Sequence, residues 1–143
     1  MNTNLDFCLG LHRAHASLQL KLDDELGIHH GIGFNDLALL NLLAQAEGGR
    51  VSIPELVRPM GQPQSAVLRQ LIMLEKIGFV VRDGANGLRQ AVLCPAGRTL
   101  VNAARETADS ICTEAVESID STVVATVSAA METLACTPTL SLS

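Results

Sequence analysis

Four residues between positions 65 and 76 have the types and the spacing that a helix needs to read nucleic acid. Ser65, Arg69, Ile72 and Lys76 recur at i, i+4, i+7 and i+11, so they share one side of a helix. Serine and arginine can hydrogen-bond to bases, lysine can pair with phosphate, and an apolar side chain can contact a thymine methyl group. A solvated helix face usually carries acidic residues, and this one has none. The pattern favours a helix that enters a DNA groove.

A second group with chemical potential lies near the N-terminus. Cys8, His12 and His15 follow an i, i+4, i+7 spacing and therefore share one helix face. A protonated histidine can activate a neighbouring thiol, which would make Cys8 a redox-sensing candidate. The same face could bind a metal together with His29 and His30, or pack in a subunit interface, or line a small-ligand pocket. These interpretations stay open, but the spacing matches no established metal signature, so we predict neither a metal nor a cofactor.

The sequence contains no arrangement typical of an enzyme. It has no phosphate-binding glycine loop and no serine, histidine and aspartate in a plausible catalytic order. The Gly31 to Gly33 pair lacks a preceding strand and is interpreted as a linker. The protein is therefore predicted not to be an enzyme.

Composition and charge point the same way. The chain has 143 residues, which fits one domain, and its four cysteines are too scattered for a disulfide framework. No apolar run reaches the ~18–20 residues of a membrane span, and the N-terminus lacks signal-peptide features. We therefore expect a soluble, cytoplasmic protein that does not contact a membrane.

The net charge of −5 is unevenly distributed. Basic residues dominate between Arg50 and Arg105, where arginines and lysine outnumber acidic residues, and the rest of the chain is strongly acidic. A local basic lobe on an acidic body suits a protein that binds DNA through one end.

The elements that position these residues are predicted by helix and turn signals. Ser52 to Glu55 has the pattern of a capping box, and the short helix it opens is expected to bend or end at Pro59. Gly61 provides a turn, and a longer helix follows from Pro63 to about Ile77. In that helix Val67, Leu71 and Leu74 form the buried stripe, and Gly78 ends it.

Two strands follow, and helices are predicted on both sides of this segment. The strands are residues 79–81 and 88–93, joined by a loop with two turn pairs, Asp83-Gly84 and Asn86-Gly87. The expected helices are 5–26, which ends at Gly27; 37–46, capped by Asn35 or Asp36; 96–119; and 123–135, capped by Asp120. The predicted fold class is mainly α with a small β-hairpin wing, that is, a winged helix-turn-helix.

The order of these elements and several motifs resemble the MarR family of bacterial winged-helix transcriptional regulators. The resemblance covers nearly the whole chain, and its residues are Leu56, Met60-Gly61, Ser65-Ala66-Val67, Arg69, Leu74-Glu75, Gly78-Phe79-Val80 and Leu93-Cys94-Pro95-Ala96-Gly97. One departure is the wing tip, where Ala85-Asn86-Gly87 stands in place of the usual aspartate and arginines.

The resemblance implies a homodimeric repressor of palindromic DNA sites that is released by a small aromatic or anionic ligand. It implies dimerisation helices within residues 1–33 and 98–143 and a winged helix-turn-helix within residues 34–97. The implied DNA-binding residues are Gln62, Pro63, Gln64, Ser65, Leu68, Arg69, Ile72, Lys76, Arg82 and Arg89. The polar residues expected nearest a ligand pocket are His12, Arg13, His15, His30 and Asp36.

Two alternatives follow from the same residues. The place of Cys8 resembles the organic-peroxide-sensing branch of the family, although the chain lacks the tyrosines that hold the sensor cysteine there. The atypical wing and the acidic balance also fit a winged-helix dimer that has lost DNA binding and acts through protein interaction.

Overall fold

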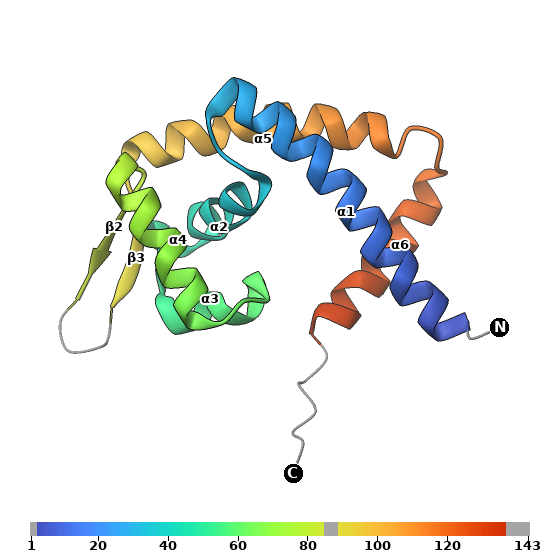
Figure 1. The fold of residues 1–143 in the computed structure, drawn as a ribbon, viewed down its shortest axis with the longest axis horizontal. Helices are drawn as coiled ribbons and strands as arrows, with labels where there is room; N and C mark the ends of the chain where they lie inside the picture. Colours follow the sequence, from blue (N-terminus) through green and yellow to red (C-terminus); the bar gives the residue numbers. More distant parts are fainter. Residues whose placement is uncertain (1–2, 85–88, 137–143) are drawn as a thin grey trace, which may run out of the picture. The chain divides into compact units, whose positions relative to one another are not determined.

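A computed structural model describes residues 3–84 and 89–136 (Figure 1). The chain forms two compact units, one that extends to Ile111 and one that begins at Cys112. The wing-tip residues 85–88, including the Asn86-Gly87 turn pair, lie outside the described residues.

The first unit is built mainly from helices, as predicted. Its elements are α1 (Thr3–His30), α2 (Phe34–Gln45), the 3-10 turn η1 (Glu47–Gly49), β1 (Arg50–Ser52), α3 (Ile53–Met60), α4 (Gln64–Ile77), β2 (Val80–Asp83), β3 (Gln90–Leu93) and most of α5 (Pro95–Ala115). The α4 helix packs against α3 and β2. The helix-turn-helix and the hairpin are thus confirmed.

The wing is a three-stranded antiparallel sheet rather than a hairpin alone. The strand order is β1-β3-β2, with Val51 opposite Ala91 and Val81 opposite Val92. The β1 strand was not predicted, because three residues are too few to show an alternating pattern. It joins the sheet only because the chain brings it beside β3.

The core of the first unit lies among α2, α3, α4 and the sheet. The predicted stripe of α4 is confirmed, since Val67 and Leu71 are 0% exposed and Leu74 is 2% exposed. They pack with the apolar side of α2 and with Leu56 and Val80. Fully burying a side chain of this size contributes about 1.5–3 kcal/mol to stability. Burial of this stripe therefore favours the orientation of α4 in which its opposite side faces solvent.

Several helix ends differ from the predictions. The α1 helix continues through Gly27, which has open space around it, and stops at Gly31, whose φ is 70°. The α5 helix ends at Ala115 rather than near Ile119. Burial of Leu26 in the first unit favours continuation of α1 over the local tendency of glycine to end a helix.

The N-cap of α2 also differs from the prediction, whereas α3 begins where it was predicted to begin. The N-cap of α2 is Gly33, not Asn35 or Asp36, and the Asp36 carboxylate instead accepts a hydrogen bond from the Gly33 N–H. At α3 the predicted start is confirmed, since Ser52 is the N-cap and Pro54 lies in the first turn, but the Ser52 side chain makes no cap hydrogen bond, so the capping box does not form. The helix ends just after Pro59, at Met60, as expected.

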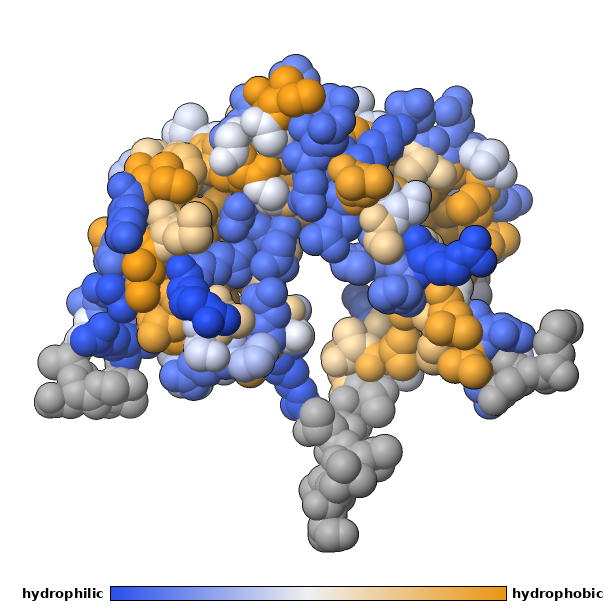
Figure 2. Space-filling model, viewed as in Figure 1, coloured by the Kyte–Doolittle hydropathy of each residue, from blue (hydrophilic) through white to orange (hydrophobic). Residues whose placement is uncertain are grey.

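The second unit contains the end of α5 and α6 (Ser121–Ala135). The predicted cap is confirmed, since the Asp120 carboxylate accepts a hydrogen bond from the Thr122 N–H at 2.8 Å. One side of α6 carries exposed apolar side chains, which are Val123, Val127, Met131 and Leu134. Figure 2 shows such apolar side chains at the surface. No helix in the described parts of the chain is long and apolar enough to cross a membrane.

Gly97 allows α5 to lie close to the Phe79 backbone and to the Leu93 side chain of β3. A Cβ at this position would lie 2.2 Å from the Phe79 carbonyl oxygen and 2.7 Å from Leu93 Cδ1. Gly97→Ala is therefore expected to lower the free energy of unfolding by about 1–3 kcal/mol or more, because the backbone must move. Urea unfolding measures this change.

Gly10→Ala is the matched control for Gly97→Ala. Nothing lies within 4 Å of the Cβ that this change adds in α1. Alanine is favoured over glycine in helices by about 1 kcal/mol, so no loss of stability is expected. Equal stability of the Gly97→Ala protein and the native protein would contradict the close packing described at Phe79.

Candidate nucleic-acid interface

The reading face of α4, made up of Ser65, Arg69, Ile72 and Lys76, lies at the surface of the first unit. Ser65, Arg69 and Lys76 are exposed and Ile72 is half-buried. The buried stripe on the opposite side of α4 holds this face outward. The two sides of the helix are therefore divided as a groove-reading helix requires.

The two cations of the reading face are Arg69 and Lys76, and both are exposed. Within the described residues, Arg69 and Lys76 form no hydrogen bond or ion pair through their side chains, and Gln64 and Ser65 form none either. A guanidinium or ammonium group that is not paired within the protein can bind phosphate or a guanine edge at little cost.

The predicted DNA-binding residues at the start of α4 differ in how far their side chains are exposed to solvent. Pro63 and Gln64 are exposed, and the Pro63 carbonyl accepts the Val67 N–H at 3.1 Å. The Gln62 Oε1 atom is buried and has no partner among the described atoms, so in this structure it is not offered to a base. Leu68 packs against the core cluster. Gln64 is thus the accessible amide at this end of the helix.

Arg82 is half-buried and is paired with Glu75. Its Nε and one terminal nitrogen donate to Glu75 Oε1 at 3.1 and 3.0 Å, and its backbone N–H donates to Glu75 Oε2 at 3.0 Å. This pair joins the C-terminal end of α4 to β2. Arg89, by contrast, is exposed.

A second arginine fastens the wing. Arg50 of β1 donates from one terminal nitrogen to Asp83 at 2.8 Å and to Gln90 at 3.0 Å. The pairs that Arg50 and Glu75 form were not predicted, because each joins two different elements and spacing along one element does not reveal such a partner. The wing base is therefore positioned by two arginine–carboxylate pairs.

The Glu75–Arg82 pair should make the free energy of unfolding depend on pH in the acidic range. The hydrogen bond from the Arg82 backbone, then that from its side chain, lowers the pKa of Glu75 below its ordinary 4.5. A lowered folded-state pKa means that the stabilisation is complete above about pH 4.5 and is lost as the pH falls through the folded-state value. Hydrogen bonding to Arg50 lowers the pKa of Asp83 in the same direction.

Glu75→Gln tests this dependence. We expect the variant to be less stable than the native protein at neutral pH and to lose less stability below pH 4.5, as measured by urea unfolding. Glu47→Gln, which removes an exposed carboxylate from η1, serves as the control. Parallel pH profiles for Glu75→Gln and the native protein would argue against the assigned role.

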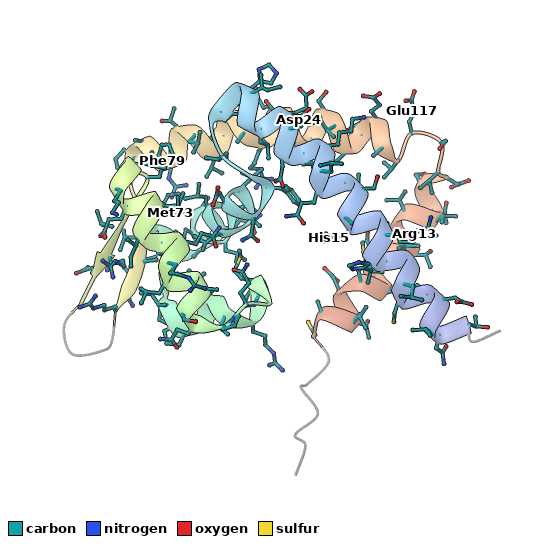
Figure 3. All side chains as sticks on the ribbon, viewed as in Figure 1. Arg13, His15, Asp24, Met73, Phe79 and Glu117 are labelled. Atoms are coloured by element: carbon teal, nitrogen blue, oxygen red, sulfur yellow. The ribbon has the colours of Figure 1, made fainter. Side chains whose placement is uncertain are left out.

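The residues predicted for a ligand pocket do not converge within the described chain. His12, Arg13 and His15 are exposed on the N-terminal half of α1, and Figure 3 labels Arg13 and His15 there. His30 lies about 27 Å along the helix from His12, and its Nε2 is 2.8 Å from Thr107 Oγ1. Asp36 is engaged at the start of α2.

A surface cavity does form around His30. Its volume is about 560 Å³. It is lined by Glu25, His29, His30, Glu106, Thr107, Ser110 and Ile111. His29 lies 3.4 Å from Glu25, so the cavity mixes imidazoles with carboxylates. Two carboxylates oppose the binding of an anion, and this cavity fits a hydrogen-bond donor better.

The redox candidate Cys8 is an exposed thiol that forms no disulfide within the described residues. Across residues 3–84 and 89–136, no group of three or more histidine, cysteine or acidic side chains is placed to hold a metal ion.

Comparison with known proteins agrees with this architecture. The family model for the IclR helix-turn-helix domain matches residues 36–84, about a third of the chain, from α2 to the end of the β2 strand. No curated protein matches the sequence. Structural similarity extends much further.

Three solved structures illustrate that similarity. A MarR-family transcriptional regulator from Rhodococcus sp. RHA1 superposes with a TM-score of 0.87 at 20% identity, covering 96% of this chain and 99% of that one. The chain has the MarR fold. The MarR-family regulator Sco3205 from Streptomyces coelicolor, solved in complex with DNA, has a TM-score of 0.81 at 20% identity and coverages of 90% and 83%.

The third solved structure that is similar to this chain is CouR from Rhodococcus jostii RHA1, bound to p-coumaroyl-CoA. Its TM-score is 0.82 at 23% identity, with 91% of each chain covered. Thus the predicted fold class is confirmed over nearly the whole chain, while the family model matches only residues 36–84.

Proposed function

We propose that this protein is a transcriptional regulator that binds double-stranded DNA by inserting α4 into the major groove. The observation that carries the proposal is the reading face, whose exposed Arg69 and Lys76 have no partner among the described residues. Both residues lie in the basic segment of the sequence between Arg50 and Arg105. The DNA complex of Sco3205, which shares the fold, supports the same use of this architecture.

We propose further that the protein acts as a homodimer. Apolar side chains are exposed on both predicted dimerisation segments, with Leu5 and Leu9 on one side of α1 exposed by 51% and 49%. The α6 helix exposes Val123 and Val127 to a similar degree, 49% and 42%. Exposed apolar rows of this kind usually mark protein interfaces. A two-fold dimer would recognise a palindromic operator with half-sites about one helical turn apart.

A small-molecule effector completes the proposal. CouR, which shares the fold, was solved with p-coumaroyl-CoA bound. We infer that an aromatic or anionic ligand of this chain would change the placement of α4 and release a repressed promoter. The predicted polar residues of α1 would then contribute to the ligand site only in an assembly of more than one chain, because they do not converge with His30 in one chain.

Selection from a random double-stranded DNA library tests the function directly. We expect enrichment of a palindromic sequence, with an affinity that falls steeply as salt rises because phosphate-bound counterions are released. If the intact dimer enriches no sequence, the protein-interaction alternative replaces this proposal.

A further inference from the structure

Gln70 lies on α4 but not on its reading face. At about 100° per residue, Gln70 is rotated by at least about 100° from each of Ser65, Arg69, Ile72 and Lys76. The side chain is half-buried and belongs to neither the reading face nor the buried stripe. Its surroundings are the start of α2.

The Gln70 carboxamide is held from both ends. Its Nε2 donates to Asp36 Oδ1 at 3.0 Å, and its Oε1 accepts from Asn35 Nδ2 at 3.4 Å. Both partners lie in the first turn of α2. A planar group bonded at both its nitrogen and its oxygen resists rotation, and any turn or slide of α4 relative to α2 would break these two hydrogen bonds.

The same network continues to α1. The second oxygen of Asp36 accepts the Gly33 N–H at 3.0 Å, and Asp23 of α1 accepts the Phe34 N–H at 2.7 Å. Gly33 lies between the two carboxylates, since a Cβ there would be 3.3 Å from Asp23 Oδ1 and 3.8 Å from Asp36 Oδ2. Free N–H groups at a helix start favour such negative partners.

We propose that Gln70 is a positioning residue for DNA recognition, which locks the rotation of α4 to the start of α2 and, through Asp36 and Asp23, to α1. This inference rests on the proposed DNA-binding function. Gln70 does not touch DNA. It aims the reading face, and movement of α1 relative to α2 reaches α4 through this network.

The test reverses the direction of the hydrogen bond. Gln70→Glu places a carboxylate against Asp36, so the two groups repel and the lock opens. The double variant Gln70→Glu with Asp36→Asn restores it with opposite polarity, because the new amide at position 36 can donate to position 70 and still accept from Gly33. The double variant also has the net charge of the native protein.

The measured quantity is the ratio of affinities for the selected operator and for a scrambled duplex. We expect Gln70→Glu to lower this ratio about tenfold, with an unchanged affinity for the scrambled duplex, and the double variant to recover most of it. A purely structural role would reduce the active fraction and so weaken both affinities equally. Gln45→Glu, the same chemical change at an exposed position of α2, should leave the ratio unchanged.

The outcomes separate this proposal from the proposed function. If the native protein selects no operator, DNA binding itself fails, and the role of Gln70 fails with it. If the operator is bound but Gln70→Glu keeps the native ratio, or the double variant recovers nothing while melting like the native protein, only the role of Gln70 is refuted.

Discussion

Arg69→Ala should abolish the sequence-specific complex with DNA without disturbing the fold. Arg69 is exposed at the centre of the reading face. A paired arginine–guanine contact discriminates by about 1–3 kcal/mol, and a two-fold dimer would lose it at both half-sites. Titration of labelled operator by fluorescence anisotropy measures the loss, and thermal melting should remain as in the native protein.

Lys21→Ala provides the charge-matched control for Arg69→Ala. Lys21 is an exposed cation of α1 that lies outside the predicted DNA-binding set. Its removal lowers the net charge by the same amount, so any general electrostatic effect appears in both variants. If Arg69→Ala retains native affinity and specificity, α4 is not the helix that reads the operator.

Val127→Glu should dissociate the dimer and thereby remove high-affinity DNA binding. Val127 is 42% exposed and lies within the apolar row of α6 with Val123, Met131 and Leu134. An unpaired carboxylate buried in an apolar interface costs several kcal/mol, which exceeds what the remaining contacts of one helix can offset. Sedimentation velocity should show a monomer. Operator affinity should fall by at least about a hundredfold, since only one half-site is held.

Ala125→Glu is the control for this change. Ala125 is exposed and rotated by about 160° from Val127 on α6, on the side that carries Glu132. The variant should remain dimeric. A Val127→Glu protein that sediments as the native protein does would exclude this row from the interface.

The sequence predicted much of the reading helix because its signals are local. The buried stripe of α4, the turn at Gly61 and the stop at Gly78 each depend on residues within a few positions of one another, and the structure has all of them. Periodicity reports which side of a helix is buried, so exposure of Arg69 and Lys76 also followed from it.

The partners of charged side chains could not be predicted in this way. Arg82 has the residue type and the place of a wing contact, yet Glu75 occupies its guanidinium. Asp36 was predicted to lie near a ligand pocket, and its hydrogen bond with Gln70 of α4 could not be foreseen from its place in α2. In both cases the deciding partner is on another element, and spacing along one element carries no information about it.

The sequence by itself thus determined the order of the helices and the hairpin, the buried side of α4 and the basic character of its surroundings. These features arise from backbone propensity, turn residues and hydrophobic periodicity, all of which act over short stretches of chain. Tertiary structure alone decided that β1 completes the wing, that Asp23 accepts the Phe34 N–H at the start of α2, and that Arg82 pairs with Glu75. Hydrogen bonds and ion pairs between distant segments form only once packing has brought their atoms to about 3 Å, which no local pattern specifies.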